Sequence, residues 1–137
     1  MDIASDVAEV IERRRAATYA LLKNWAGHLE SEAKQGASWR DRTAHARQSL
    51  NSGVEQKGSK FVLYLAHGVA YGRYLEEGTP PHLIKPKHKK ALYWRGAAHP
   101  VKVVRHPGSR SYAIVGPTVA ANEQRIINTV KELLGGE

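Results

Sequence analysis

The 137-residue sequence contains no cysteine. A chain without thiols cannot form a disulfide, a cysteine-ligated zinc site or a thiol nucleophile. It also lacks any apolar run near the roughly 20 residues that a membrane-spanning helix needs. Its first residues include Asp2, Asp6 and Glu9, where a secretory signal peptide would be basic and then apolar. We therefore expect a protein of the reducing cytoplasm that has no membrane as a partner.

Acidic residues are absent from a long stretch in the second half of the chain, between Gly78 and Asn122. The basic residues of this stretch are Lys85, Lys87, Lys89, Lys90, Arg95, Lys102, Arg105 and Arg110. Most of the net charge of +8 lies in this half. Charge this one-sided is informative about partners more than about folding. We predict a basic loop that is either solvated or docked on an acidic neighbouring subunit, with contact to the phosphates of a nucleic acid as the alternative.

Motifs of common catalytic sites are also missing. The patterns GxxxxGK(S/T), GxGxxG and GxSxG do not occur, so nucleotide hydrolysis and serine esterase chemistry have no support. The histidines of the second half form no compact set of metal ligands. They are His82, His88, His99 and His106. We predict no metal, no cofactor and no enzymatic activity.

Two adjacent carboxylates, Glu76 and Glu77, are the only acidic residues near the basic stretch on its N-terminal side. General acid and base catalysis would require two carboxylates placed in one cleft. Neighbouring residues of a helix point in different directions, so at most one of the two could face a given site. We predict that Glu76 is a surface or turn-capping carboxylate.

Helical periodicity is clearest at the two ends of the chain. Apolar residues recur at three- and four-residue steps from Asp2 to about Gln35, which predicts a long amphipathic helix that stops at Gly36. Its length of about 45 Å exceeds what a compact domain of this size requires, so part of it should project or pack between subunits. A second helix is predicted from about Thr118, as its cap, to Leu134, with Gly135 and Gly136 as the stop.

Shorter elements are predicted between these helices. The best strand candidate is Lys60–Ala66, with residues 53–55 as a weaker partner strand and residues 56–59 as the turn. The short helices are predicted at residues 44–50, with Thr43 as cap, and at residues 67–77, ended by Gly78. Further strands are expected at residues 91–95, 101–105 and 111–115, the first two joined through residues 96–100.

The order of these elements favours an α+β fold with a small, mostly antiparallel sheet of three or four strands and a short inserted helix. We expect one domain, residues 1–137. Within it, residues 1–36 form the N-terminal helix, residues 37–117 hold the sheet, short helices and basic loop, and residues 118–137 form the C-terminal helix.

Four short motifs follow one another in the middle of the chain. The first runs from Trp39 to Thr43 and the second, Tyr-Gly-Arg-Tyr-Leu-Glu-Glu-Gly-Thr, from Tyr71 to Thr79. The third, Ile-Lys-Pro-Lys-His-Lys-Lys-Ala-Leu, runs from Ile84 to Leu92, and the fourth is a His-Pro-Gly turn. Their order resembles the HK97 gp10-like family of tailed-phage proteins, which act at the head-tail junction as tail-completion or neck components.

The residues of the motifs that we single out are Trp39, Arg42, Thr43, Tyr71, Tyr74, Leu75, Glu76, Gly78, Thr79, Pro86, His106, Pro107 and Gly108. Tyr71, Tyr74 and Leu75 are expected to anchor the short helix, and Gly78 to let the chain reverse before the prolines stiffen it.

The resemblance implies a structural virion protein that forms a ring, commonly six-fold, between a portal-side connector and the tail tube, after assembly in the host cytoplasm. Its partners would be copies of itself and the neighbouring head-tail connector, tail terminator or tail-tube proteins. Double-stranded DNA in the channel would be a further contact of the basic loop.

Two other functions stay open from the residues alone. A small basic protein that binds DNA or RNA would account for the acid-free stretch, and its affinity would fall steeply with salt. A nuclease or toxin-like enzyme that uses His82 or His106 has far less support, because no second catalytic group accompanies either histidine.

Overall fold

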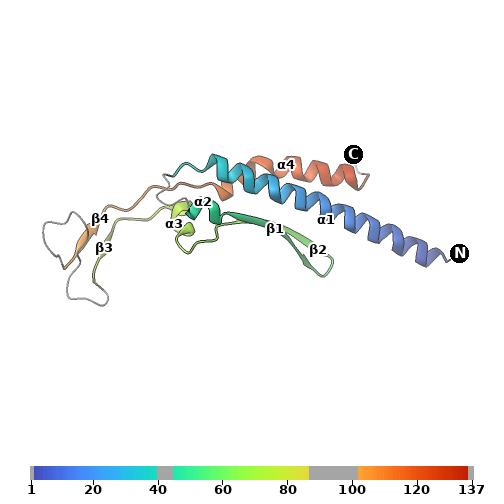
Figure 1. Cartoon of the computed structure of the whole chain (residues 1–137), viewed down its shortest axis with the longest axis horizontal. Coiled ribbons are helices and arrows are strands. Elements are labelled where there is room, and N and C mark those ends of the chain that lie inside the picture. Colours follow the sequence, from blue (N-terminus) through green and yellow to red (C-terminus); the bar gives the residue numbers. More distant parts are fainter. Residues whose placement is uncertain (1, 40–44, 87–101, 136–137) are drawn as a thin grey trace.

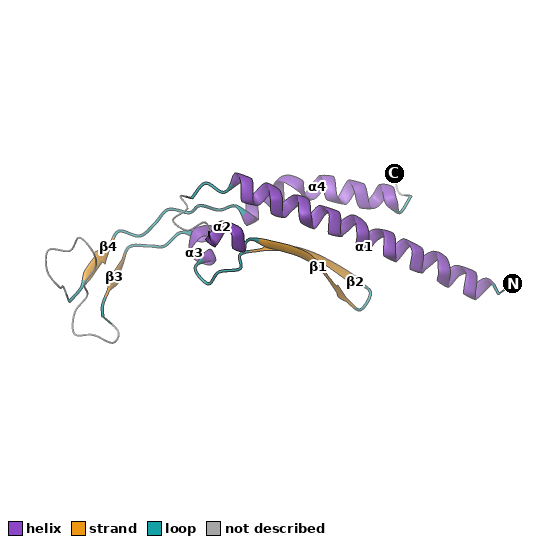
Figure 2. Ribbon diagram, in the orientation of Figure 1, coloured by secondary structure: helices purple, strands orange, loops and turns teal. Residues whose placement is uncertain are grey.

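The computed structural model describes residues 2–39, 45–86 and 102–135, which form an α+β arrangement (Figure 1). The elements are α1 (Ile3–Gly36), α2 (His45–Ser49), β1 (Asn51–Lys57), β2 (Lys60–Ala66), α3 (Gly72–Glu77), β3 (His82–Ile84), β4 (Val104–His106) and α4 (Val115–Leu133). The predicted fold class is confirmed. The molecule is elongated, with α1, α4 and the β1–β2 hairpin together and the β3–β4 pair apart from them at one end (Figure 2).

The long helix α1 confirms the helix predicted from the apolar periodicity of the first 35 residues. The side chain of Asp2 caps it by accepting a hydrogen bond from the N–H of Ala4 at 3.1 Å. At the other end, the guanidinium of Arg47 donates to the carbonyls of Lys34, Ala37 and Trp39. Because the last carbonyls of a helix have no partner within it, Arg47 ties α2 to the end of α1.

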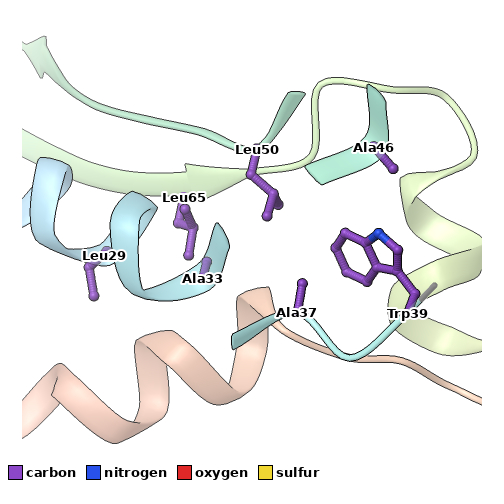
Figure 3. Packing of buried hydrophobic residues seen from close by; sticks show 7 residues of the cluster. All are labelled: Leu29, Ala33, Ala37, Trp39, Ala46, Leu50 and Leu65. Atoms are coloured by element: carbon purple, nitrogen blue, oxygen red, sulfur yellow. The ribbon is translucent and has the colours of Figure 1, made fainter. Parts of the chain in front are cut away.

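The hydrophobic core lies around the C-terminal half of α1, where it meets α2 and β2 (Figure 3). Its buried members are Leu29, Ala33, Ala37, Trp39, Ala46, Leu50 and Leu65. The small alanines of α1 let the larger side chains of Leu50 and Leu65 approach the helix closely. Residues 2–14 of α1 are exposed throughout, so this core stabilises only one half of the helix.

The C-terminal helix α4 packs alongside α1. The indole N–H of Trp25 donates to the hydroxyl of Thr129 at 2.9 Å. The buried Asn122 donates to a carboxylate oxygen of Glu32 at 2.7 Å. These polar contacts fix how the two helices lie, since each buried donor needs its acceptor.

The β1–β2 hairpin confirms the predicted strand Lys60–Ala66 and extends its partner to Asn51–Lys57. The register pairs Asn51 with Ala66 and Lys57 with Lys60. The turn is therefore two residues, Gly58 and Ser59, shorter than the predicted residues 56–59. Gly58 has a φ of 60°, which glycine adopts without steric cost.

Several predicted boundaries are wrong. Helix α3 begins at Gly72, five residues after the predicted start, although it ends before Gly78 as expected. Of the predicted strand at residues 111–115, residues 111–114 form a loop that leads into α4 and Val115 is the first residue of the helix. The alternation of the side chains is present, because Tyr112 and Ile114 are half-buried and pack against the core cluster, but none of the described strands pairs with this segment.

The start of α4 also differs from the prediction. The helix begins at Val115, and Thr118 is buried inside it and is not its cap. Gly135, with a φ of 80°, follows the end of the helix as expected. The sequence prediction failed at the start because the cap of α4 comes from a residue far away in the chain, described below.

The described strands form two separate antiparallel pairs, in place of one sheet of three or four strands. Strand β4 starts three residues after the predicted residue 101, and its partner β3 was not predicted as a strand. The predicted short helix at residues 44–50 is confirmed as α2, His45–Ser49. Its proposed cap, Thr43, lies outside the described residues. The predicted strand 91–95 and its connection 96–100 also lie outside them.

Candidate interaction site

A projecting arm is the main candidate site. We call residues 78–86 and 102–110 the basic arm. They leave the rest of the chain after α3 and return to it before α4 (Figure 1). Within the arm, β3 pairs with β4 in an antiparallel register that places the backbone of His82 opposite His106 and that of Ile84 opposite Val104. Strands of three residues in an isolated pair have little stability of their own, so the position of the arm depends on its attachment.

Several side chains of the basic arm are positively charged and exposed to solvent. Its described cations, Lys85, Lys102, Arg105 and Arg110, are all exposed. The other predicted members of the basic set, Lys87, Lys89, Lys90 and Arg95, lie outside the described residues. Two apolar side chains lie among the cations, Leu83 at 56% exposure and Val103 at 46%. The arm therefore presents a mixed basic and apolar surface.

The described residues before 78 and after 110 are called the body. Two glycines from the motifs lie next to each other where the arm leaves the body. Gly78 has a φ of 77° and Gly108 a φ of 85°, both in the left-handed region that other residues rarely adopt. A Cβ on Gly78 would lie 2.7 Å from the carbonyl oxygen of Ser109. A Cβ on Gly108 would lie 2.8 Å from the carbonyl carbon of Pro80. The two segments can approach each other closely only because neither residue has a side chain.

A short bridge next to these glycines joins the same two segments. Thr79 and Ser109 exchange backbone hydrogen bonds, N–H to carbonyl, at 3.0 Å in both directions. Their hydroxyl groups also lie 3.0 Å apart. Ser109 was not predicted as a site residue, since a serine after His-Pro-Gly reads only as part of a turn.

Glu76 connects α3 to the first turn of α4. One carboxylate oxygen accepts hydrogen bonds from the N–H groups of Ile114, at 2.9 Å, and Val115, at 3.1 Å. The other accepts from the N–H of Gly116 at 2.9 Å. The first N–H groups of a helix have no partner within it, and a carboxylate there also interacts favourably with the helix dipole. Of the two roles predicted for Glu76, surface or turn-capping, the structure shows capping, and the element that Glu76 caps is the distant helix α4.

His67 lies on the other side of this carboxylate. Its Nε2 is 3.2 Å from the Glu76 oxygen that also binds Ile114 and Val115. The ring is nearly buried and lies 5.9 Å, centroid to centroid, from the ring of Trp39. Its Nδ1 is buried and has no hydrogen-bond partner among the described residues. We refer to Glu76–Thr79, Gly108–Gly116 and His67 together as the arm base.

Hydrogen bonds to Glu76 affect the pKa of its carboxyl group more than burial does. Burial raises the pKa of the carboxyl group, but the N–H groups of Ile114, Gly116 and Val115 and the ring of His67 lower it further than burial raises it. The pKa therefore lies below its ordinary value, and Glu76 is ionised at neutral pH. A charged residue here stabilises the junction between arm and body.

Further backbone contacts complete the arm base. The N–H of Tyr112 donates to the carbonyl of Leu75 at 2.7 Å, and the hydroxyl of Ser111 donates to the carbonyl of Glu76. The guanidinium of Arg110 lies over the ring of Tyr112, 4.7 Å from its centroid. The segment that enters α4 is thus fixed to α3 along its length.

The remaining motif residues differ in their surroundings. Trp39 is buried in the core, and Leu75 packs against it. Tyr71 and Tyr74 are exposed, so the expectation that they anchor α3 is wrong: the helix is short and presents them to solvent. Pro86 is half-buried, Pro107 is exposed and His106 is the last residue of β4, while Arg42 and Thr43 lie outside the described residues.

The described residues hold no group of three or more His, Cys, Asp or Glu side chains placed to bind a metal ion. Among the same residues, no helix has the length and apolar character to cross a membrane.

Comparison of the chain with protein-family models, with curated proteins and with solved structures finds no match.

Proposed function

We propose that this chain is a structural protein of a tailed bacteriophage virion, which forms a ring at the head-tail junction and acts in tail completion or head-tail joining. The observation that carries the proposal is the meeting of two separated motifs at one place. Glu76, Gly78 and Thr79 come from one motif and Gly108 from another, and all of them take part in the arm base.

The chemistry of these contacts supports a role in positioning the arm. The motif residues act through a left-handed backbone, a close approach, a pair of backbone hydrogen bonds and a helix cap, which are structural roles. The exposed part of the arm carries cations and apolar side chains, a composition suited to docking. We propose that the protein is not an enzyme and that its surfaces act by binding neighbours.

The shape of the molecule supports a ring of copies. Subunits of a cyclic ring contact each other through two different surfaces, one on each side. An elongated chain with the basic arm at one end and the exposed start of α1 at the other offers two such surfaces (Figure 1).

Inactivation of the gene in the phage or prophage that carries it tests the proposal. We expect heads and tails to accumulate without joining, or tails to end abnormally at the head-proximal end, as seen by electron microscopy. Restoration of joined particles by a plasmid copy is the control. Particles that assemble and infect normally without the protein would contradict the proposal.

The exposed cations of the arm favour one second candidate, a nucleic-acid-binding protein. Lys85, Lys102, Arg105 and Arg110 lie in a stretch without a carboxylate, which would suit contact with phosphates. Titration of labelled double-stranded and single-stranded DNA or RNA at low salt tests this candidate. Binding that weakens steeply as salt is added would support it, and no binding at low salt would remove it.

A further inference from the structure

The first turns of α1 extend beyond the rest of the molecule. Helix α4 ends beside Arg14, whose guanidinium donates to the carbonyl of Leu133 at 2.9 Å. The β1–β2 hairpin reaches α1 near Tyr19, whose ring lies 5.9 Å from that of Phe61. Residues 2–12, which we call the projecting turns, lie beyond both neighbours, at the far end of the molecule from the basic arm (Figure 1).

The projecting turns carry an apolar stripe. Its members, Ile3, Val7, Val10 and Ile11, are between 50% and 80% exposed. Their spacing of three and four residues places them on one face of the helix, where with Asp6 they line a shallow hollow. A helix that continues past its core with such a stripe exposes apolar surface that a partner would bury.

The charge around this stripe is opposite to that of the basic arm. Residues 2–12 contain Asp2, Asp6, Glu9 and Glu12 and no lysine or arginine. Glu9 pairs with Arg13 and Asp2 caps the helix, which leaves Asp6, beside the stripe, as the carboxylate best placed to meet a partner there. The basic arm has cations around Leu83 and Val103. The two ends therefore complement each other both in charge and in exposed apolar side chains.

We propose that the basic arm of one copy of this chain docks on the projecting turns of α1 of a second copy. The two surfaces lie at opposite ends of one molecule, so they meet only between copies (Figure 2). Leu83 and Val103 would cover the stripe of Val7 and Val10, while Arg105 or Lys102 faces Asp6, which lines the same hollow. The contact joins two different surfaces, so it repeats from copy to copy and can close into a ring. The assignment of this contact to a ring in the virion rests on the proposed function.

Disulfide trapping tests the contact directly, because the natural chain has no cysteine to interfere. One sample carries Val7→Cys and a second carries Leu83→Cys, and the two are mixed under mild oxidation. We expect a covalent dimer in the mixture and little in either sample alone. The matched control is Ser5→Cys, which lies on the opposite face of the same turns and is also exposed.

Three outcomes of the trapping would overturn the proposal. They are the absence of any covalent dimer in the mixture, equal trapping by Ser5→Cys, and preferential trapping of Val7→Cys with itself. The last result would indicate a symmetric contact between two α1 helices, in place of contact between α1 and the arm.

A charge exchange provides a second test that does not depend on thiols. We expect Asp6→Lys to weaken self-association several-fold at low salt, because it replaces an attraction by a repulsion. Lys102→Glu with Arg105→Glu should have a similar effect, and mixing the two variants should restore association. Glu123→Lys, on an exposed position of α4, is the control. Association that is weakened by either variant but not restored in the mixture would contradict the proposal.

The failure of this contact and the failure of the proposed function are distinguishable. If phage particles need the protein but Val7→Cys and Leu83→Cys do not link, the contact is wrong and the virion role stands. If the cysteines link specifically but particles assemble normally without the protein, the contact stands and the virion role is wrong.

Discussion

The body and the basic arm are held in place by different forces. Leu29 and Leu50 in the body are each 1% exposed, and burial of such side chains is the main source of folding free energy. The arm has two three-residue strands, in which the described side chains, Leu83 and Arg105, are exposed, and it is attached through hydrogen bonds and two glycines at its base. Stability is thus concentrated in one region and the candidate docking surface in the other. Substitutions should separate the two properties.

The largest effect on stability is expected in the body. Leu29→Ala should lower the free energy of unfolding by about 3 kcal/mol, because it removes buried methyl groups and leaves a cavity. Chemical denaturation monitored by circular dichroism measures the change. Ile3→Ala, at a position 80% exposed, is the control and should change stability by less than about 0.5 kcal/mol. Equal effects of the two substitutions would contradict the placement of the core.

A smaller loss is expected at the junction of the two regions. Gly78→Ala should cost about 1–3 kcal/mol, because alanine is strained at a φ of 77° and its Cβ would press on the carbonyl of Ser109. The matched control is Gly27→Ala in the open middle of α1, where the same change should stabilise by about 0.5–1 kcal/mol. Thermal and chemical unfolding of the pair should therefore shift in opposite directions.

Glu76→Gln should cost about 1 kcal/mol, since the amide keeps the shape of the side chain but loses the charge at the first turn of α4. Glu77→Gln tests the neighbouring carboxylate, which is exposed and pairs with Arg73, and should change stability by less than about 0.5 kcal/mol. Similar losses in both variants, measured by denaturation at pH 7, would argue against the capping role.

The lowered pKa of Glu76 predicts that the stability of the fold depends on pH. The pKa of Glu76 is lowered in the folded protein, so its contribution is present above its ordinary pKa of about 4.5 and is lost as pH falls through the lower folded-state value. The stability difference between the natural chain and Glu76→Gln should therefore shrink below about pH 4.5. Denaturation series at several pH values measure it. A difference that stays constant down to pH 3 would contradict this assignment.

Sequence patterns predicted the elements that depend on nearby residues. The three- and four-residue periodicity of α1, the β-forming run Lys60–Ala66 and the glycine after α3 are local signals, and the structure confirms all three. Strand β3 was missed because its three residues form a strand only against β4, which lies far along the chain. The start of α4 was misplaced for a similar reason, since its cap is Glu76 and not the nearby Thr118.

Some parts of the candidate site could be predicted from the sequence and others could not. The absence of acidic residues predicted an exposed basic surface, and the resemblance pointed to Gly78, where the chain was expected to reverse, and to Gly108, but the physical reason that the two glycines share was not predicted. That reason is the close approach of two segments that the sequence separates by about thirty residues. Ser109 and His67 carried no signal, because a hydroxyl or imidazole gains its role only from the partner that folding brings to it.

The smallest effect on stability is expected in the basic arm, and there the effect on association should be largest. Lys102→Glu with Arg105→Glu changes two exposed side chains, so the free energy of unfolding should stay within about 0.5 kcal/mol of its natural value. A change of several kcal/mol would mean that the arm contributes to the core, which would remove the distinction between the two regions.

Sedimentation velocity of this arm variant beside the natural chain, at low salt and after nuclease treatment, shows whether the basic arm is a docking surface. We expect the natural protein to sediment as an assembly of several copies and the equally folded variant to sediment as a smaller species. A natural chain that remains monomeric at every concentration, or a variant that assembles as well as the natural chain, would contradict the claim that the basic arm is a docking surface.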